Sequence, residues 1–177
     1  MKKIKLIIPF LLIAILFSFK CRKNEVLPQL PAETQTGANT FGCKINDTIY
    51  LPTGTPFTCP AYNVQYYKSD GALLIKTSST CASGLNVYLY NVSQAKDYEI
   101  FNPIANAYYY RNSRNSNSNC NLYERLNSVQ TGTVTITRLD LINKIVSGKF
   151  NGILKIAGCP DIVITEGRFD FKMDVYN

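Results

Sequence analysis

Apolar and polar residues alternate with a period of two through much of the last third of the chain, from Gly132 to Met173. The apolar positions are Val134 and Ile136, then Val146, Gly148, Phe150, Gly152, Leu154 and Ile156, and finally Phe169, Phe171 and Met173. Alternate positions of a strand, which we call its two parities, face opposite sides of the sheet. One apolar and one polar parity are typical of antiparallel strands with one face packed against a core. Glu166-Gly167 interrupts the alternation, and this predicts a bulge that shifts the phase of the last strand.

Shorter alternating runs, separated by turn residues, precede this segment. Phe41, Cys43 and Ile45 share one parity, and Asn46-Asp47 then predicts a tight turn into a second strand. Further strands are expected near residues 63–68, 72–77, 85–92, 98–101, 107–111 and 122–126. About ten short strands and no convincing helix predict an all-β fold, either an antiparallel β-sandwich or a partly closed barrel.

The first 20 residues have the pattern of an export signal. Lysines among residues 1–5 precede an apolar stretch, residues 6–19, which is short for a membrane span. Cys21 follows directly, as the lipidated cysteine does in bacterial lipoproteins, although Lys20 departs from the small residue that is usual before it. We expect residues 1–20 to be a lipoprotein signal peptide, residues 21–39 a flexible tether, and residues 40–177 a single β domain.

This organisation predicts a protein held on the cell envelope, with the outer membrane as its expected location, by a lipid on Cys21. The net charge does not add a nucleic-acid partner. The formal charge is +7, but outside residues 1–20 the chain has 15 basic against 12 acidic side chains, which leaves +3. Because no basic stripe remains, we expect no nucleic-acid binding.

The chain has six cysteines: Cys21, Cys43, Cys59, Cys81, Cys120 and Cys159. Export would place them in a compartment that permits disulfides. If Cys21 carries a lipid, at least one of the other five stays unpaired, and the sequence does not determine the pairing. Cys59, Cys120 and Cys159 lie in or beside expected loops and are the favoured bridging positions. Cys43 lies on an apolar parity and is expected to be a buried free thiol.

The chain contains no histidine. Ser-His-Asp catalysis, Cys-His catalysis and imidazole-ligated metal sites are therefore excluded, and no Cys-x-x-Cys pair indicates zinc. The carboxylates considered for glycosidic chemistry are Asp140, Glu166 and Asp170. Asp170 alternates with Phe169 and Phe171, so it is expected to point to solvent. We expect no enzyme, no cofactor and no metal.

Tyrosines gather in the middle of the chain. Tyr88 and Tyr90 share one parity of an expected strand, as do Tyr108 and Tyr110. These four residues are the candidate ligand face, because exposed tyrosines beside asparagines can stack on sugar rings or on a peptide. The alternative is that they are ordinary strand-surface residues that complete cross-strand pairs.

Several runs together resemble a known family. They are TQTGANTFGCKIN from Thr34, GTVTITRLD from Gly132, IVSGKF from Ile145 and ITEGRFD from Ile164. Their order and spacing, along residues about 36–177, resemble uncharacterised Bacteroidetes lipoproteins of the DUF6252 type. The departures are Tyr50, where the family often has tryptophan, and the additional Cys81 and Cys159. The resemblance implies an exported, membrane-anchored β domain and assigns no catalytic residue.

Three hypotheses for function follow. The favoured one is a lipid-anchored, non-catalytic binding or interaction module of the cell envelope, with a glycan or an envelope protein as its ligand. The alternative is a glycan-active enzyme, or an accessory protein to one, which needs a convergent carboxylate pair. A small outer-membrane barrel is the third, and the uneven strand lengths disfavour it.

Overall fold

The computed structural model describes residues 28–55, 57–101 and 106–177. These residues form twelve strands, one 3₁₀ turn at Ser118–Cys120 and no α-helix. The strands are β1 (Thr40–Ile45), β2 (Thr48–Tyr50), β3 (Tyr62–Tyr67), β4 (Ala72–Thr77), β5 (Ser83–Leu89), β6 (Asp97–Phe101), β7 (Ala107–Asn112), β8 (Leu122–Tyr123), β9 (Val129–Asp140), β10 (Ile145–Lys155), β11 (Ile162–Lys172) and β12 (Asp174–Tyr176). The all-β prediction is confirmed.

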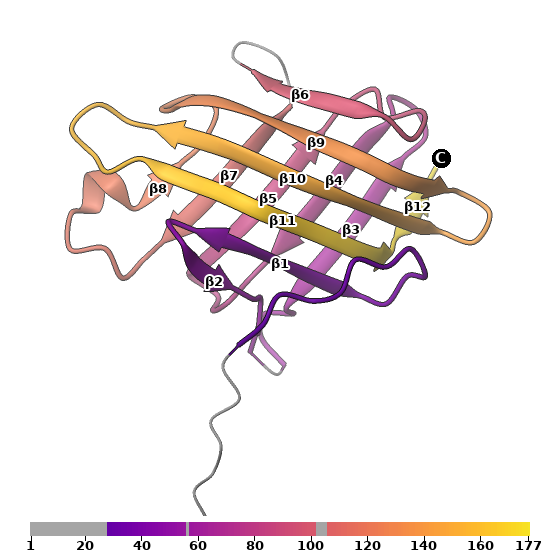
Figure 1. Cartoon of the computed structure of the whole chain (residues 1–177), viewed down its shortest axis with the longest axis horizontal. Coiled ribbons are helices and arrows are strands. Elements are labelled where there is room, and N and C mark those ends of the chain that lie inside the picture. The colour runs from indigo at the N-terminus through magenta and orange to yellow at the C-terminus, as the bar shows by residue number, and fades with distance from the viewer. Residues whose placement is uncertain (1–27, 56, 102–105) are drawn as a thin grey trace, which may run out of the picture.

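The strands form two sheets that pack face to face (Figure 1). The first sheet has the order β2-β1-β11-β10-β9-β6, and the second has the order β12-β3-β4-β5-β7-β8. Each sheet ends in edge strands, so the architecture is a sandwich and the partly closed barrel is not formed. The first sheet combines β9, β10 and β11 with the N-terminal hairpin and β6, and the second holds the other strands from the middle of the chain together with the last strand, β12.

The predicted bulge is present in β11. Glu166 has φ +52, and the register against both β1 and β10 shifts beside it. Before the bulge Ile162 and Ile164 face the core, and after it Phe169 and Phe171 do. The extra residue thus keeps the apolar side chains of one long strand on the same face of the sheet.

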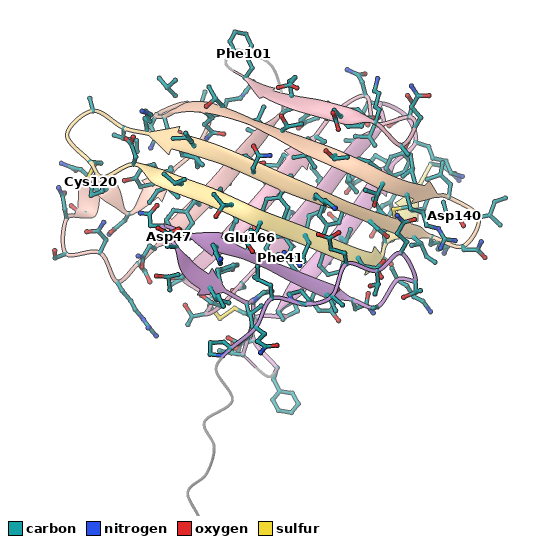
Figure 2. All side chains as sticks on the ribbon, in the orientation of Figure 1. Phe41, Asp47, Phe101, Cys120, Asp140 and Glu166 are labelled. Carbon is teal, nitrogen blue, oxygen red and sulfur yellow. A yellow bond between two sulfur atoms is a disulfide. The ribbon has the colours of Figure 1, made fainter. Side chains whose placement is uncertain are left out.

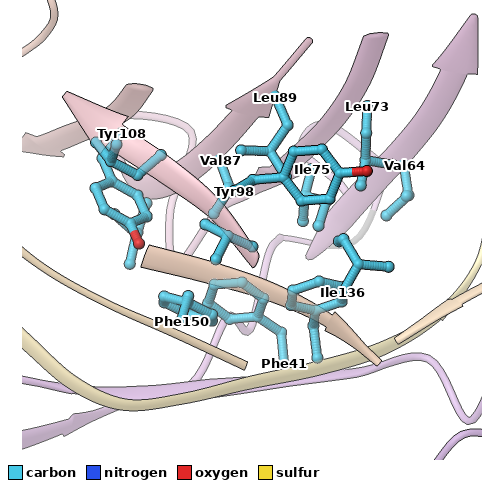
Figure 3. Close-up of a cluster of buried hydrophobic side chains, with 14 of the residues drawn as sticks. Phe41, Val64, Leu73, Ile75, Val87, Leu89, Tyr98, Tyr108, Ile136 and Phe150 are labelled. Atoms are coloured by element: carbon cyan, nitrogen blue, oxygen red, sulfur yellow. The ribbon is translucent and has the colours of Figure 1, made fainter. Parts of the chain in front are cut away.

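The core lies between the two sheets (Figure 3). Three glycines of the first sheet make room there for aromatic rings. A Cβ atom on Gly148 would lie 2.6 Å from the ring of Phe169, and one on Gly152 would lie 2.5 Å from the ring of Tyr108. Gly167 accommodates the ring of Phe150 in the same way. The rings of Phe169 and Phe150 thus lie over glycines of the neighbouring strand in the same sheet, and Gly152 accommodates a ring from the opposite sheet.

Residues 28–39 were predicted to belong to a flexible tether. In the structure they form an ordered segment on the outer face of the first sheet, which we call the strap. Asp170 holds this strap: its carboxylate accepts hydrogen bonds from Thr34 Oγ1 (2.6 Å), the backbone amides of Thr36 (2.9 Å), Gly37 (2.8 Å) and Ala38 (3.1 Å), and Ser147 Oγ (2.8 Å). Asp170 is on the solvent parity, as expected, but the prediction that it points to solvent is wrong. The strap covers it, and it is only 1% exposed.

Charged side chains of the sheet also bind the strap. Lys149 Nζ lies 2.7 Å from a carboxylate oxygen of Glu33, and Arg138 donates a hydrogen bond to the carbonyl of Gln35. Asn39 Oδ1 accepts a hydrogen bond from the amide of Lys172 (3.0 Å) at the end of the strap. Bonds to the sheet thus fix the strap along its length. The side chains that form them are on the outward-facing positions of the strands.

Two disulfides are present. Cys59–Cys81 joins the loop between β2 and β3 to the loop between β4 and β5, and Cys120–Cys159 joins the two sheets. The favoured bridging positions are confirmed, with Cys81 as the fourth member. Cys43 is a buried free thiol, as predicted, and burial raises its pKa to about 12. A thiol with such a pKa is almost wholly protonated at neutral pH and is a poor nucleophile. Cys21 lies outside the described residues.

Candidate ligand-binding face

The candidate face is the outer surface of the second sheet, where β5 and β7 are neighbours. These strands pair antiparallel, with Val87 opposite Tyr108 and Tyr88 opposite Ala107. Val87 is buried in the core, so the alternation directs Tyr88 outward. Tyr88 is half-buried and Tyr90 is 37% exposed. The structure therefore places these two predicted residues on the outer face.

Tyr108 and Tyr110 lie on the opposite side of β7. Tyr108 is fully buried, its hydroxyl donates to the carbonyl of Asn151 (2.7 Å), and its ring packs against Phe150. Tyr110 is half-buried and packs against the buried Tyr123. The side chains of Tyr108 and Tyr110 therefore lie on the core side of β7 and take part in packing, and Tyr108 also lines the hollow described below. Their expected role as ligand residues stays a prediction.

Tyr109 is the residue of the outer face that the sequence analysis missed. It lies opposite Asn86, next to Tyr88 in the pattern of pairing. The sequence held a signal for it, because Tyr109 shares its parity with the charged Arg111, and a charged residue favours the solvent side of a strand. The tyrosines of the candidate face at β5 and β7 are thus Tyr88, Tyr90 and Tyr109.

These tyrosines border a shallow hollow of about 240 Å³. Its lining also includes Glu124, Arg125 and Leu126 from the segment after β8. Leu126 is 84% exposed and stands beside the ring surfaces without being buried by them. The hollow is smaller than the ~300–1,000 Å³ of typical small-molecule pockets, so it suits part of a larger ligand better than an enclosed small molecule.

Local hydrogen bonds hold the tyrosines in position. Asn86 Nδ2 donates to the hydroxyl of Tyr88 (3.3 Å), and Asn106 Oδ1 accepts from the amide of Tyr90 (2.8 Å). Burial raises the pKa of Tyr88, and the hydrogen bond from Asn86 opposes this effect. Its phenol is therefore neutral at physiological pH. The face offers aromatic rings with hydroxyl and amide groups at their edges.

Comparison with known proteins finds no match among protein-family models, curated proteins or solved structures. The resemblance to a lipoprotein family therefore stays a prediction, and the site is argued from its geometry.

The three carboxylates that were considered for catalysis are each engaged elsewhere. Asp140 accepts hydrogen bonds from Asn143 and Arg138 at the turn after β9, and these bonds lower its pKa. Glu166 forms an ion pair with Lys44 (2.5 Å) at the bulge, and Asp170 lies under the strap. Figure 2 shows Asp140 and Glu166 far apart on the first sheet. Neither residue lines the hollow bordered by the tyrosines.

The described residues also bear on metal sites and on membrane-spanning helices. No group of three or more histidine, cysteine, aspartate or glutamate side chains is arranged to hold a metal ion there. No helix within the described ranges is long and apolar enough to cross a membrane. The predicted signal segment, residues 1–20, and the lipidation residue Cys21 lie outside those ranges.

Proposed function

We propose that this protein is a lipid-anchored binding module of the cell envelope, and that the face formed by Tyr88, Tyr90 and Tyr109 binds glycan chains. The observation that carries the proposal is the presence of three tyrosines on one exposed sheet surface around a shallow hollow. The resemblance to exported lipoproteins and the signal-like residues 1–20 support the envelope location.

The chemistry of the face favours a sugar over a charged ligand. Aromatic rings pack against the apolar C–H faces of sugars, while hydroxyl and amide groups bond to sugar hydroxyls. Tyr88 and Tyr109 supply rings, and Asn86 lies between them in the pairing of β5 with β7. Glu124 and Arg125 bring one charge of each sign to the rim, so the hollow has no dominant charge. A neutral polysaccharide is therefore the ligand class proposed.

The binding site is tested with the mature chain, residues 21–177, carrying Cys21→Ser so that no lipid is attached. We expect Tyr88→Ala and Tyr109→Ala each to weaken binding to envelope polysaccharide about tenfold, the loss typical of one stacking ring. Tyr88→Phe keeps the ring and should bind nearly as well. Calorimetric titration with purified polysaccharide fractions measures the affinities.

The control is Tyr176→Ala. Tyr176 is 42% exposed and stacks on Tyr67 at the edge of the same sheet, away from the residues that line the hollow. This variant should bind normally. Polysaccharide binding that survives both Tyr88→Ala and Tyr109→Ala would contradict the assignment of the site.

The anchor is tested by mass spectrometry of the protein taken from bacterial membranes. We expect the mature chain to begin at Cys21 and to carry acyl chains, since two or more chains give stable membrane attachment. Cys21→Ser should release the protein from the membrane fraction. A membrane-bound protein that still contains residues 1–20, without acyl mass on Cys21, would refute lipid anchoring.

A further inference from the structure

Phe57 is the most exposed large apolar side chain of the described residues, with a relative exposure of 108%. It stands at the tip of the loop between β2 and β3. Backbone hydrogen bonds between Thr55 and Cys59 in both directions close this tip, and the Cys59–Cys81 disulfide fixes its base. An apolar ring is thus held away from the body on a cross-linked loop.

The backbone of Phe57 is also unfavourable for its residue type. Its φ is +70, in the left-handed region that glycine and asparagine adopt far more readily than a bulky side chain. Because the side chain is fully exposed, no packing against the described residues offsets this conformation. Strain of this kind is concentrated at functional sites, which makes Phe57 a candidate contact residue.

The surroundings of Phe57 carry no charge along the chain. Residues 48–67 contain no acidic or basic side chain, and neither do residues 77–95. The loop between β4 and β5 belongs to the second of these stretches, and it bonds to the Phe57 loop through Gly54 and Thr53. We call these two loops together the uncharged pole. The other fully exposed apolar residues differ, since Ile142 lies between Asp140 and Lys144 and Leu126 follows Arg125.

Basic side chains border the uncharged pole. Arg111 and Arg114 line a hollow together with Thr53, Ser79 and Thr80. The apolar tip is surrounded by neutral polar groups, and arginines lie at its margin. This arrangement is complementary to an anionic membrane surface, in which apolar acyl chains lie beneath charged headgroups. At such a surface the ring would enter the acyl boundary, and the arginines would meet the headgroups.

The strap reaches the sandwich at the same pole. A Cβ atom on Gly42 would meet Pro31, Leu51 and Leu30, so the start of the strap lies against Leu51, which leads directly into the Phe57 loop. Figure 1 shows the described chain beginning at this end of the molecule. Cys21 is seven positions before Pro28, and seven residues span at most about 25 Å. A lipid on Cys21 would therefore keep the uncharged pole close to the bilayer.

We propose that the uncharged pole is a second membrane contact, in which Phe57 inserts into the lipid surface and fixes the orientation of the sandwich. This inference rests on the lipid anchor of the proposed function, which brings the pole to the bilayer. β5 begins at Ser83 beside the pole, and Tyr90 lies just beyond its other end. With Phe57 inserted, Tyr90 and its end of the tyrosine face would point away from the membrane.

Tryptophan fluorescence tests the contact, because the chain contains no tryptophan of its own. Phe57→Trp is made in the full chain, produced in a bacterial host that acylates it, and reconstituted into vesicles of phosphatidylcholine and phosphatidylglycerol. Part of the phosphatidylcholine carries bromine on its acyl chains. We expect emission to shift to the blue and to fall about twofold, as for a ring at the acyl boundary.

The matched control is Phe101→Trp. Phe101 is 54% exposed and lies at the opposite end of the sandwich from the start of the strap (Figure 2). Its replacement should show no shift and no quenching by brominated lipid. Both sites are exposed, so neither substitution disturbs the core.

Amide hydrogen exchange of the unsubstituted protein gives a second readout that needs no variant. Exchange at Phe57 and Thr58 should slow on vesicles relative to the chain with Cys21→Ser in solution. Unchanged exchange together with unquenched Phe57→Trp, on protein that floats with the vesicles, would overturn the membrane contact and leave the anchor intact.

A protein that fails to float would instead refute the anchor. The same fluorescence measurement is then made on protein held by an N-terminal polyhistidine tag on nickel-chelating lipid. Quenching of Phe57→Trp there supports the contact without the natural lipid, and absence of quenching overturns it.

Discussion

Replacing Asp170 by alanine should lower the free energy of unfolding by about 3–4 kcal/mol, because a hydrogen bond to a charged acceptor contributes ~1.5–3 kcal/mol and several are lost together. The carboxylate accepts bonds from three consecutive backbone amides of the strap and from the hydroxyls of Thr34 and Ser147. Without it these donors would be left beside a small apolar side chain. The strap should detach from the sheet, and the chain between Cys21 and the sandwich should lengthen.

Acid should weaken the same contact. Burial tends to raise the pKa of Asp170, but the hydrogen bonds from Thr34, Ser147, Thr36 and Ala38 outweigh burial and lower the pKa below its ordinary value. A carboxyl group with a lowered pKa in the folded state contributes stability that is complete above the pKa of the unfolded chain, near 3.9. We expect this contribution to decline as the pH falls from about 5 toward the lower pKa of the folded state.

Urea unfolding of the chain with Cys21→Ser, measured at pH 7 and at pH 3, tests both statements. Asp170→Asn, which keeps the shape and loses the charge, should be destabilised less than Asp170→Ala. Asp140→Ala is the control, because Asp140 also has a lowered pKa but bonds to Arg138, Ile142 and Asn143 of its own hairpin and not to the strap itself. If Asp170→Ala unfolds at the same urea concentration as Asp140→Ala, the strap does not stabilise the fold.

The role of Asp170 shows what the alternation of apolar and polar residues cannot predict. Alternation with Phe169 and Phe171 correctly placed the side chain on the outward face of β11. Alternation describes a strand relative to its own sheet, however, and it contains no information about a segment more than 130 residues away in the sequence that returns to cover that face. The strap itself, with its prolines and polar residues, has no periodicity of its own, so its sequence resembles that of a tether.

The strands could be predicted from the sequence because the alternation of apolar and polar residues in a half-buried strand depends only on that strand. The bulge at Glu166 could also be predicted, since the apolar positions change phase there. Only part of the tyrosine face could be predicted from the sequence. Tyr88 followed from its neighbours Val87 and Leu89, whereas residues 107–110 offer a run of alanine and three tyrosines in which either parity could face the core. The pairing of β7 with β5 resolves this ambiguity, because it places Tyr108 opposite the buried Val87.

The disulfide between the sheets should have the second large effect on stability. Cys120 ends the 3₁₀ turn between β7 and β8 in the second sheet, and Cys159 lies between β10 and β11 in the first. The buried Tyr123 reinforces the same junction, because its hydroxyl donates to the carbonyl of Pro160 (2.7 Å). The two sheets are therefore joined at this end by a covalent bond and by a partly buried hydrogen bond.

Chain entropy sets the size of the effect. The sequence separation of 39 between Cys120 and Cys159 corresponds to about 4 kcal/mol of stabilisation through restriction of the unfolded chain. Cys120→Ala and Cys159→Ala are made together, so that no free thiol remains to exchange with the Cys59–Cys81 bridge. We expect the melting temperature of the chain with Cys21→Ser to fall by roughly 10 °C, since 1 kcal/mol shifts a domain of this size by ~2–4 °C.

Two comparison variants separate the cross-link from the loss of a buried side chain. Cys43→Ala removes a buried sulfur without breaking a bridge, and it should cost only about 1 kcal/mol. The pair Cys59→Ala and Cys81→Ala opens a loop with a separation of 22, worth about 3 kcal/mol, but both ends of this bridge belong to loops that flank the second sheet. Only loss of Cys120–Cys159 should also accelerate hydrogen exchange at β8, the edge strand that this bridge secures to the first sheet. A melting temperature unchanged by loss of Cys120–Cys159 would mean that the packed core alone holds the two sheets together.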